Sequence, residues 1–201
     1  MKALLYSLIF IMLLAFGAQA QNSIYRNSLG IGFERVGLDG PDATGNRYLL
    51  RYARHFRNDR LVLIGDFGYV NAPNSRYLPL TNNVYVRGKR RERLTTDATF
   101  AFDFISHSRH ALRLGAGPSL WYRQDELMGP SRYTVLSDGS VTNVQINWVS
   151  VKEFNYGFNV LVEYEHAFTE RLLASAKLKF ASLERAGQSS IYGVGLGYRL
   201  R

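Results

Sequence analysis

The last segment of the chain alternates strictly between large apolar residues and small or charged ones. The large residues occupy every second position, at Tyr192, Val194, Leu196, Tyr198 and Leu200, and the positions between them hold glycine or arginine. Successive side chains of a strand point to opposite faces, so one face of this strand is apolar and the other is small and charged. The same alternation returns repeatedly between residues 47 and 200. A water-soluble sandwich does not keep its small and charged residues on the side that forms the core, so the pattern predicts a barrel whose outer face meets lipid.

The beginning of the chain has the features of a cleaved signal peptide. Lys2 precedes an apolar stretch over residues 3–16, and Ala18-Gln19-Ala20 forms a small-x-small cleavage site. An N-terminal membrane anchor is the alternative, but the apolar stretch is shorter than the roughly 20 residues that a spanning helix needs. We therefore expect a signal peptide at residues 1–20 and one barrel domain at residues 21–201.

Composition restricts how the mature chain can enter a membrane. The chain has no cysteine, which excludes disulfides and lipid attachment to a cysteine after the signal. No apolar run after residue 20 is long enough for a spanning helix, and only helices and closed barrels satisfy their backbone groups in lipid. Without Lys2 the formal charge falls from +9 to +8. Nucleic acid is not an expected partner of a secreted barrel despite this basic balance.

Eight segments have strand character, and their connections alternate between tight and long. The expected strands are residues 23–36, 47–56, 61–71, 93–105, 110–123, 148–166, 172–182 and 190–200. Tight turns fall at residues 57–60, 106–109 and 167–171, and longer connections at residues 37–46, 72–92, 124–147 and 183–189. Bacterial outer-membrane barrels have short periplasmic turns and long extracellular loops. The sequence thus predicts an all-β fold, an eight-stranded antiparallel up-and-down transmembrane β-barrel with both termini on the periplasmic side.

The third long connection carries a hairpin signal of its own. Ser137-Asp138-Gly139-Ser140 lies between two β-rich segments, and Asp-Gly favours a primed turn. The fifth and sixth strands are therefore expected to continue as a ribbon above the membrane. Gly129-Pro130 is expected to interrupt this ribbon, and Pro118 to produce a bulge in the fifth strand because proline removes a ladder hydrogen bond.

Charged residues on the inward face test the barrel assignment. A barrel of eight strands is just wide enough to be filled by side chains, so its charges must be paired. When outward positions are matched across the tight turns, three pairs of oppositely charged residues face one another: Arg51 with Asp66, Asp103 with Arg113, and Glu163 with Lys177. Four further inward charges, Asp97, Glu165, Lys179 and Arg199, are expected to join them. We expect a plugged interior in which Glu163 and Lys177 lie within reach of one another.

A secreted, lipocalin-like barrel is the main architectural alternative. Such a barrel turns its apolar residues inward, which would make Phe100, Phe102 and Phe104 core and expose Glu163. Three features favour the membrane orientation: the glycine-rich opposite face, the alternation of connections, and the aromatic residues near strand ends. Those aromatic residues, which could form interfacial girdles, are Tyr48, Phe56, Tyr69, Tyr122, Tyr164 and Tyr198.

The mature chain resembles the small eight-stranded outer-membrane barrels, the outer membrane protein A-like family, in the version found as stand-alone barrels in Bacteroidetes-type bacteria. The likeness is carried by Ala18-Gln19-Ala20, residues 112–119, residues 162–172 and the final Gly195-x-x-Tyr198-x-Leu200. The last motif looks like the C-terminal signal that the barrel-assembly machinery reads. That family usually ends on an aromatic residue, whereas this chain has Leu200 followed by Arg201.

The densest basic run lies in the second long connection and is the main candidate binding segment. Its basic residues, Arg87, Lys89, Arg90, Arg91 and Arg93, could bind the phosphates of lipopolysaccharide or an anionic polymer. A solvated basic edge without a ligand is the alternative. The four histidines have no recognisable metal-ligand spacing, so no metal or cofactor is expected.

Ser106-His107-Ser108 invites comparison with outer-membrane lipid A deacylases. Those enzymes present a His/Ser/Glu arrangement toward the outer leaflet, whereas this triplet lies in a tight turn at the other end, without the family's spacing. The sequence therefore favours a monomeric, non-enzymatic barrel with a structural or surface-interaction role, in contact with membrane lipid and lipopolysaccharide. A lipid A-modifying enzyme, a narrow pore and a secreted carrier remain the alternatives.

Overall fold

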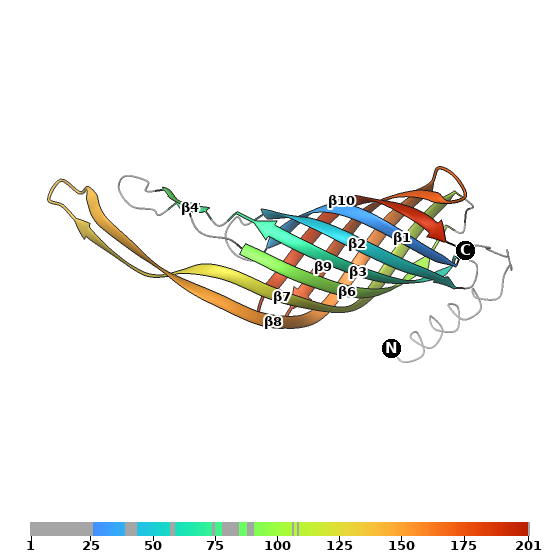
Figure 1. Cartoon of the computed structure of the whole chain (residues 1–201), viewed down its shortest axis with the longest axis horizontal. Helices are drawn as coiled ribbons and strands as arrows, with labels where there is room; N and C mark the ends of the chain where they lie inside the picture. The colour runs from blue at the N-terminus through green and yellow to red at the C-terminus, as the bar shows by residue number, and fades with distance from the viewer. Residues whose placement is uncertain are drawn as a thin grey trace, which may run out of the picture.

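Eight of the strands of the chain form a closed barrel (Figure 1). The computed structural model describes residues 26–38, 44–56, 59–73, 75–77, 85–87, 91–105, 107 and 109–200, so the predicted signal peptide lies outside the described residues. The strands are β1 (Asn27–Leu38), β2 (Thr44–Phe56), β3 (Leu61–Ala72), β4 (Ser75–Tyr77), β5 (Tyr85–Arg87), β6 (Arg91–Asp103), β7 (His110–Val135), β8 (Val141–Ala167), β9 (Leu172–Leu183) and β10 (Gly187–Leu200). No helix within the described ranges is long and apolar enough to cross a membrane.

The order of strands around the barrel is β1-β10-β9-β8-β7-β6-β3-β2, and all neighbours are antiparallel. This arrangement confirms the predicted eight-stranded up-and-down barrel. β1 and β10 close it, with Asn27 opposite Leu200, so both ends of the wall lie at the end where the β2–β3, β6–β7 and β8–β9 turns are found. We call this the turn end. The small β4–β5 hairpin, which the sequence did not predict, lies within the β3–β6 connection toward the opposite end (Figure 1).

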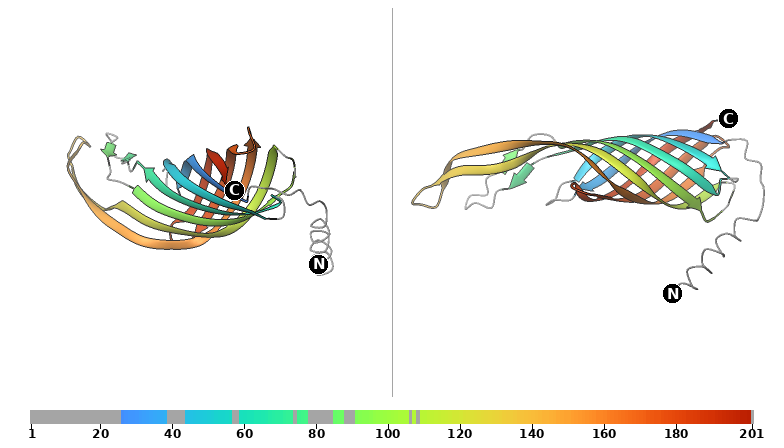
Figure 2. Two further views of the ribbon diagram at one scale, coloured as in Figure 1. Left: turned by 45° about the vertical axis from the view of Figure 1, so that its right-hand side comes forward. Right: turned by 90° about the horizontal axis from the view of Figure 1, so that it is seen from below.

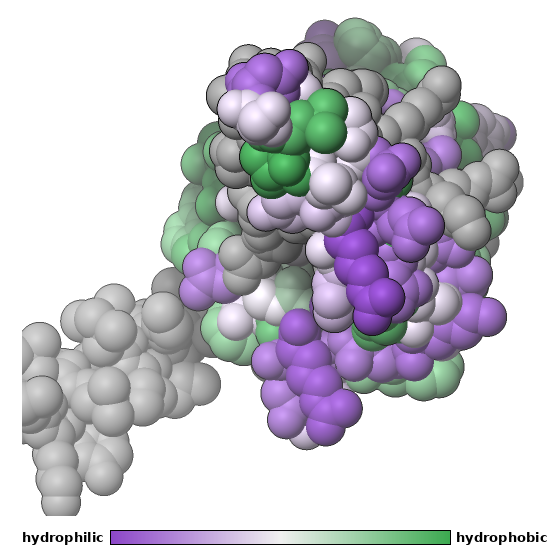
Figure 3. Space-filling view, turned by 90° about the vertical axis from the view of Figure 1, so that its left-hand side faces the viewer, coloured by the Kyte–Doolittle hydropathy of each residue, from purple (hydrophilic) through white to green (hydrophobic). Residues whose placement is uncertain are grey.

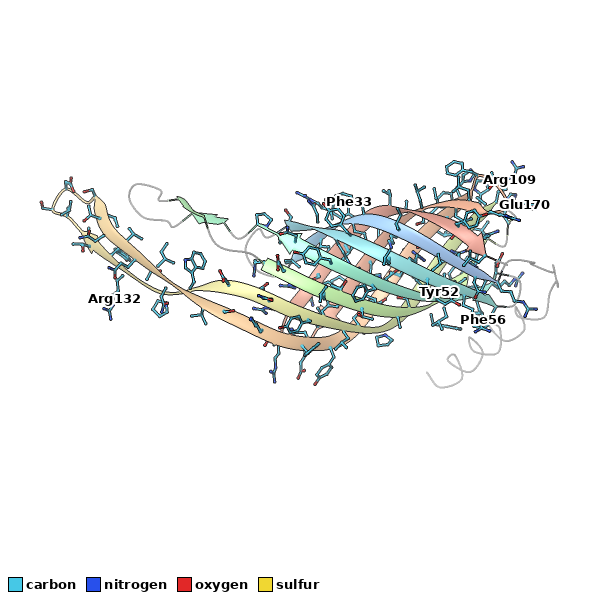
Figure 4. The ribbon with its side chains drawn as sticks, viewed as in Figure 1. Phe33, Tyr52, Phe56, Arg109, Arg132 and Glu170 are labelled. Atoms are coloured by element: carbon cyan, nitrogen blue, oxygen red, sulfur yellow. The ribbon has the colours of Figure 1, made fainter. Side chains whose placement is uncertain are left out.

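Apolar side chains cover the outside of the barrel and charged ones fill its inside. Ile31 and Leu50 are each 62% exposed, whereas the side chains of Arg47 and Glu163 are 0% exposed. Labelled aromatic residues such as Tyr52 project away from the wall (Figure 4). This arrangement would be unfavourable in water, because the exposed apolar surface would be far larger than the apolar patches of soluble monomers. The orientation is that of a membrane barrel, and the lipocalin alternative is wrong.

The interior is packed in layers along the barrel axis. Toward the end opposite the turns, an apolar plug surrounds Trp121 and contains Val36, Val70 and Leu183. The middle holds the charged residues, and a second apolar cluster around Ile64 and Leu161 lies beside them. Buried apolar and paired charged side chains thus fill the described part of the interior.

Glycines allow neighbouring strands to approach one another closely. A Cβ atom on Gly157 would stand 1.9 Å from the carbonyl oxygen of Ser182, and one on Gly117 would stand 2.0 Å from that of Ala98. Real Cβ atoms do not tolerate such distances, so these strand positions require glycine. The glycine-rich inward face thus has a direct packing reason.

β7 and β8 continue far beyond the barrel as a two-stranded ribbon (Figures 1 and 2). We call the end of the barrel from which it extends the ribbon end. The register shifts between Met128 and Ser131, so the interruption expected at Gly129-Pro130 is present. At the tip, the Gly139 amide donates to the Leu136 carbonyl at 2.9 Å and Gly139 has φ 79°.

The predicted primed turn at Asp138-Gly139 and the predicted bulge at Pro118 are both wrong. Only Gly139 of the Asp138-Gly139 pair has positive φ, which makes the tip a type I turn with a glycine bulge instead of a primed turn. At Pro118 the β6–β7 ladder is interrupted, yet the register is unchanged on both sides, with Asp97 opposite Ser119 and Phe100 opposite Ala116. The missing donor is therefore accommodated without an extra residue.

The connection between β9 and β10 is also shorter than expected. It contains only residues 184–186, whereas the sequence indicated a long connection over residues 183–189. The amide of Glu184 donates to the Tyr156 carbonyl at 3.0 Å, which ties this turn to β8. The ribbon of β7 and β8 is consequently the longest described projection at this end.

Candidate functional site: the sealed interior and the ribbon end

Six buried charges of alternating sign form a closed ring in the middle of the barrel: Glu34, Arg47, Asp97, Lys179, Asp66 and Lys177. The guanidinium of Arg47 lies 3.0 Å from Glu34 and 2.8 Å from Asp97. The ammonium of Lys179 lies 3.0 Å from Asp97 and 2.6 Å from Asp66. Lys177 completes the ring, at 3.9 Å from Asp66 and 2.8 Å from Glu34. Three cations and three anions thus neutralise one another.

A second set of charges lies nearer the turn end. Arg113 contacts Glu163 at 3.2 Å and Glu165 at 2.7 Å, and Arg51 makes two hydrogen bonds to Glu163. Arg199 reaches Glu165 at 3.4 Å. These pairs hold strands together across the interior, since Arg51 and Glu163 are 112 residues apart.

The three predicted charge pairs face one another in the strand register, but their charged groups bind other partners. Arg51 stands opposite Asp66, Asp103 opposite Arg113, and Glu163 opposite Lys177. Arg51 and Arg113 both bind Glu163, and Lys177 binds Glu34 and Asp66. In so narrow an interior a long side chain reaches across the centre as easily as to its neighbour. The four additional charges expected there, Asp97, Glu165, Lys179 and Arg199, all belong to these two sets.

Asp103 has a different role from the one expected. Its carboxylate accepts hydrogen bonds from the backbone amides of Ile105 at 3.1 Å and Leu112 at 3.0 Å. It therefore stabilises the β6–β7 turn, while Arg113 binds the two glutamates. Sequence reasoning also missed Glu34 and Arg47. Their positions follow from parity, because Glu34 shares the face of Gly30 and Gly32.

The apolar plug and the charge ring are joined at Trp121. Its indole N–H donates to Asp97 at 3.0 Å, and the guanidinium of Arg47 lies 5.8 Å from the ring centroid. Ser119 adds a further hydrogen bond to Asp97 at 2.7 Å. The Asp97 carboxylate thus accepts from four donors, two on each oxygen.

Part of the predicted basic loop lies inside the ribbon end. Arg91 is 5% and Arg93 2% exposed, and both turn toward Asp125, with Arg123 as a third arginine. The distances to Asp125 are 3.5 Å from Arg91, 3.3 Å from Arg93 and 2.9 Å from Arg123. The expectation that Arg91 and Arg93 form an exposed loop is therefore wrong, because the strand begins at residue 91 and its alternation turns both inward. Arg87 ends β5, and Lys89 and Arg90 lie outside the described residues.

The ribbon has two outer edges that bind no other strand. The β6 pairing of β7 ends at Asp125, and the β9 pairing of β8 begins at Gly157. Beyond these points the described ranges show only the β7–β8 ladder. Between residues 127 and 151 only Arg132 and Asp138 are charged. At the tip, Ser140 donates to Asp138 from its hydroxyl and its amide, which lowers the pKa of that carboxyl.

Three histidines gather at the turn end. The ring of His110 lies 5.1 Å from that of His107 and 4.8 Å from that of His166, and the Tyr164 hydroxyl lies 2.6 Å from the His110 Nδ1. Within the described part of the chain, no three His, Cys, Asp or Glu side chains are placed to hold a metal ion. Of the triplet Ser106-His107-Ser108, only the histidine is described.

The residues of the expected assembly signal all belong to β10. Gly195 faces inward opposite Gly32, Tyr198 is 45% exposed on the outer face, and Leu200 ends the strand opposite Asn27. Arg201 lies outside the described residues. Recognition of this motif by the assembly machinery stays a prediction.

Solved structures show the same fold. Ail, the attachment invasion locus protein of Yersinia pestis, is 14% identical and matches over 88% of this chain and 99% of its own with a TM-score of 0.54; it has also been solved with the heparin analogue sucrose octasulfate. Neisserial surface protein A is 13% identical over 88% and 97%, with a TM-score of 0.54. A major outer membrane protein from Thermus thermophilus is 8% identical over 88% and 100%, with a TM-score of 0.57. No protein-family model and no curated sequence matches the chain.

The class of protein follows from the fold together with the orientation of the side chains. An apolar exterior, a charged and sealed interior and the fold of small outer-membrane barrels place this chain in the outer membrane. Short turns at one end and the long ribbon at the other are typical of such barrels, with the turn end facing the periplasm. These neighbours are outer-membrane barrels, and the likeness extends to the fold of this chain.

Proposed function

We propose that this barrel is a monomeric, non-enzymatic surface-interaction protein that presents the β7–β8 ribbon outside the cell. The observation that carries the proposal is the pair of unpaired ribbon edges, which begin beyond Asp125 on β7 and before Gly157 on β8. An isolated two-stranded hairpin is marginally stable in water. Exposed strand edges are sites at which an extended polypeptide adds as a further strand. The ribbon is thus suited to bind an external protein through its backbone.

The composition of the ribbon supports this use. Edges that proteins protect from association usually carry lysine or proline, whereas residues 127–151 contain no lysine, two charged residues and a single proline, Pro130. Several of their apolar side chains are exposed. Val135 is 58% and Tyr133 49% exposed near the tip. The view along the axis onto the ribbon end shows hydrophobic and hydrophilic residues side by side there (Figure 3). Such a surface combines apolar contact area with available backbone hydrogen bonds.

Deleting the ribbon tests the proposal. A variant in which residues 127–151 are replaced by a short turn leaves every barrel pairing intact, because β6 pairs with β7 only as far as Asp125. We expect cells carrying this variant to lose attachment to protein-coated surfaces, while a heat-modifiability gel still shows the folded barrel. Attachment equal to that of wild-type cells would contradict the proposal.

We also propose that the basic run before β6 contacts lipopolysaccharide through Arg87, Lys89 and Arg90. The supporting observation is the cluster of arginines beside this loop. Arg91, Arg93 and Arg123 converge on Asp125, Arg123 also contacts Glu153 at 3.4 Å, and the Nε and Nη1 of Arg93 have no hydrogen-bond partner among the described residues. Neutralising Arg87, Lys89 and Arg90 to glutamine is expected to weaken binding to lipopolysaccharide-containing liposomes, with Arg132→Gln at the ribbon tip as control. Binding that is unchanged by the triple substitution would remove this part of the proposal.

A further inference from the structure

A groove of about 1050 Å³ lies on the lipid-facing wall of the barrel. Its lining comes from six neighbouring strands, β3, β2, β1, β10, β9 and β8, and is almost entirely apolar. The strand register arranges the outward residues in two adjacent rows that cross these strands. In one row His166 stands beside Ala174 and Ala174 beside Leu196. In the other, Tyr164 stands beside Ala176 and Ala176 beside Val194.

Side-chain size explains why the wall is hollow at this place. Most outward positions carry large residues, such as Phe33 and Tyr48, whose rings lie 5.5 Å apart on the far side of the groove. Ala174 and Ala176 are consecutive small residues on the outward face of β9, and they leave a recess between these rings and Tyr164. A recess in a face surrounded by lipid is filled by whatever apolar chain packs best against it.

At β8 the groove is lined by Tyr164 and His166, and further polar and cationic groups lie outside the lining at the turn end of the barrel. His110 lies 2.6 Å from the hydroxyl of Tyr164, and His166 follows on the same strand. Arg171 donates a hydrogen bond to the hydroxyl of Tyr198 at 3.1 Å. Tyr198 lies on β10 one outward position nearer the turn end than Leu196. Arg109 is exposed at the same end of the barrel (Figure 4) and its carbonyl accepts the amide of the residue after His166 at 2.8 Å. Guanidinium and imidazole groups at the turn end can donate hydrogen bonds to an anionic lipid headgroup.

We propose that this groove is a binding site for one phospholipid of the periplasmic leaflet, with an acyl chain over Ala174 and Ala176 and the phosphate near Arg171, Arg109 and His166. The apolar lining fits the chain, and the cationic end fixes which leaflet it comes from. The lining contains no residue of the ribbon, and the headgroup end lies at the turn end of the barrel, so the site is independent of the proposed surface function.

Native mass spectrometry of the full chain in mild detergent, titrated with phosphatidylglycerol, tests the site. We expect one tightly held lipid per barrel and much weaker binding of diacylglycerol with the same chains, which lacks the phosphate. Filling the recess with Ala174→Leu and Ala176→Leu is expected to weaken phosphatidylglycerol binding by about tenfold or more, because the chain loses its close contacts. Ala98→Leu is the matched control, since Ala98 is a lipid-facing alanine of β6 outside the groove, and its affinity is expected to equal that of wild type.

The headgroup contacts are tested separately. Arg109→Gln with Arg171→Gln is expected to weaken phosphatidylglycerol binding by about tenfold or more, the value of one charge-assisted hydrogen bond, and to leave diacylglycerol binding unchanged. A heat-modifiability gel shows that each variant is folded, and Ala176→Val provides a milder filling of the recess. The proposal is overturned if the filled variant binds phosphatidylglycerol as wild type does, if diacylglycerol binds equally well, or if the groove is occupied by lipopolysaccharide or a second copy of the chain.

Discussion

Replacing Asp97 by asparagine should cost this barrel about 3–5 kcal/mol of its free energy of unfolding. The two carboxylate oxygens of Asp97 have separate partners. Oδ1 accepts from Ser119 at 2.7 Å and Trp121 at 3.0 Å, whereas Oδ2 faces Arg47 at 2.8 Å and Lys179 at 3.0 Å. Asparagine keeps the first oxygen but puts an amide N–H₂ against the two cations. Two charge-assisted hydrogen bonds of about 1.5–3 kcal/mol each are lost, and the ring is left with three cations and two anions.

Urea unfolding of the barrel in lipid vesicles, followed by the folded band on a heat-modifiability gel, measures this loss. Glu170→Gln is the control, because Glu170 is exposed in a turn and should change stability by less than about 0.5 kcal/mol. Adding Lys179→Met to Asp97→Asn removes one cation and restores equal charge, so part of the loss should be recovered. A loss below about 1 kcal/mol for Asp97→Asn would refute the view that the ring is a buried, interdependent unit.

Three other changes test the packing of the barrel. Gly157→Ala places a Cβ 1.9 Å from a carbonyl oxygen and should cost about 1–3 kcal/mol in the same unfolding assay, whereas Gly65→Ala, whose nearest neighbour would be 3.9 Å away, should be close to neutral; equal effects would contradict the packing argument. Wild-type protein in planar bilayers should show no steady conductance, and Trp121→Ala, which removes the centre of the plug, should produce it in barrels that remain folded; an open wild-type channel would disprove the sealed interior. Asp103→Ala should destabilise the β6–β7 turn by about 1–3 kcal/mol, since two amides lose their acceptor, and an unchanged midpoint would count against that role.

The alternation of side chains predicted the eight barrel strands, and the glycine-rich face, the tight and long connections and the aromatic residues near strand ends predicted which face meets lipid. Once Tyr192 and Leu196 are assigned to lipid, parity determines the face of every other residue on that strand and, through the register, on its neighbours. This is why residues such as Glu163 and Lys177 could be placed inside from sequence. In a membrane barrel every outward position has to be compatible with lipid, which makes the inward and outward faces of each strand easier to tell apart.

The partners of the inward charges could not be predicted in the same way. Facing positions follow from the register, but the contact between Arg51 and Glu163 crosses the interior between strands that are not neighbours. Such contacts depend on the length of each side chain and on where glycines leave space, and neither produces a periodic pattern in the sequence. The inward turn of Arg91 and Arg93 was missed for a related reason, because the start of β6 lies in a run whose basic residues obscure the alternation.

The ring of charges also ties assembly to completion of the wall. Glu34 is supplied by the first strand and Lys177 by the ninth, and they become neighbours only after the tenth strand has docked against the first. A half-assembled sheet therefore contains Lys177 without this counter-ion, in surroundings where an uncompensated ion is costly. Intermediates with an open seam are disfavoured relative to the finished cylinder, so the last docking step is expected to be steeply cooperative. The seam itself is lined inside by glycines such as Gly30 and Gly197, which need no side-chain ordering as it closes.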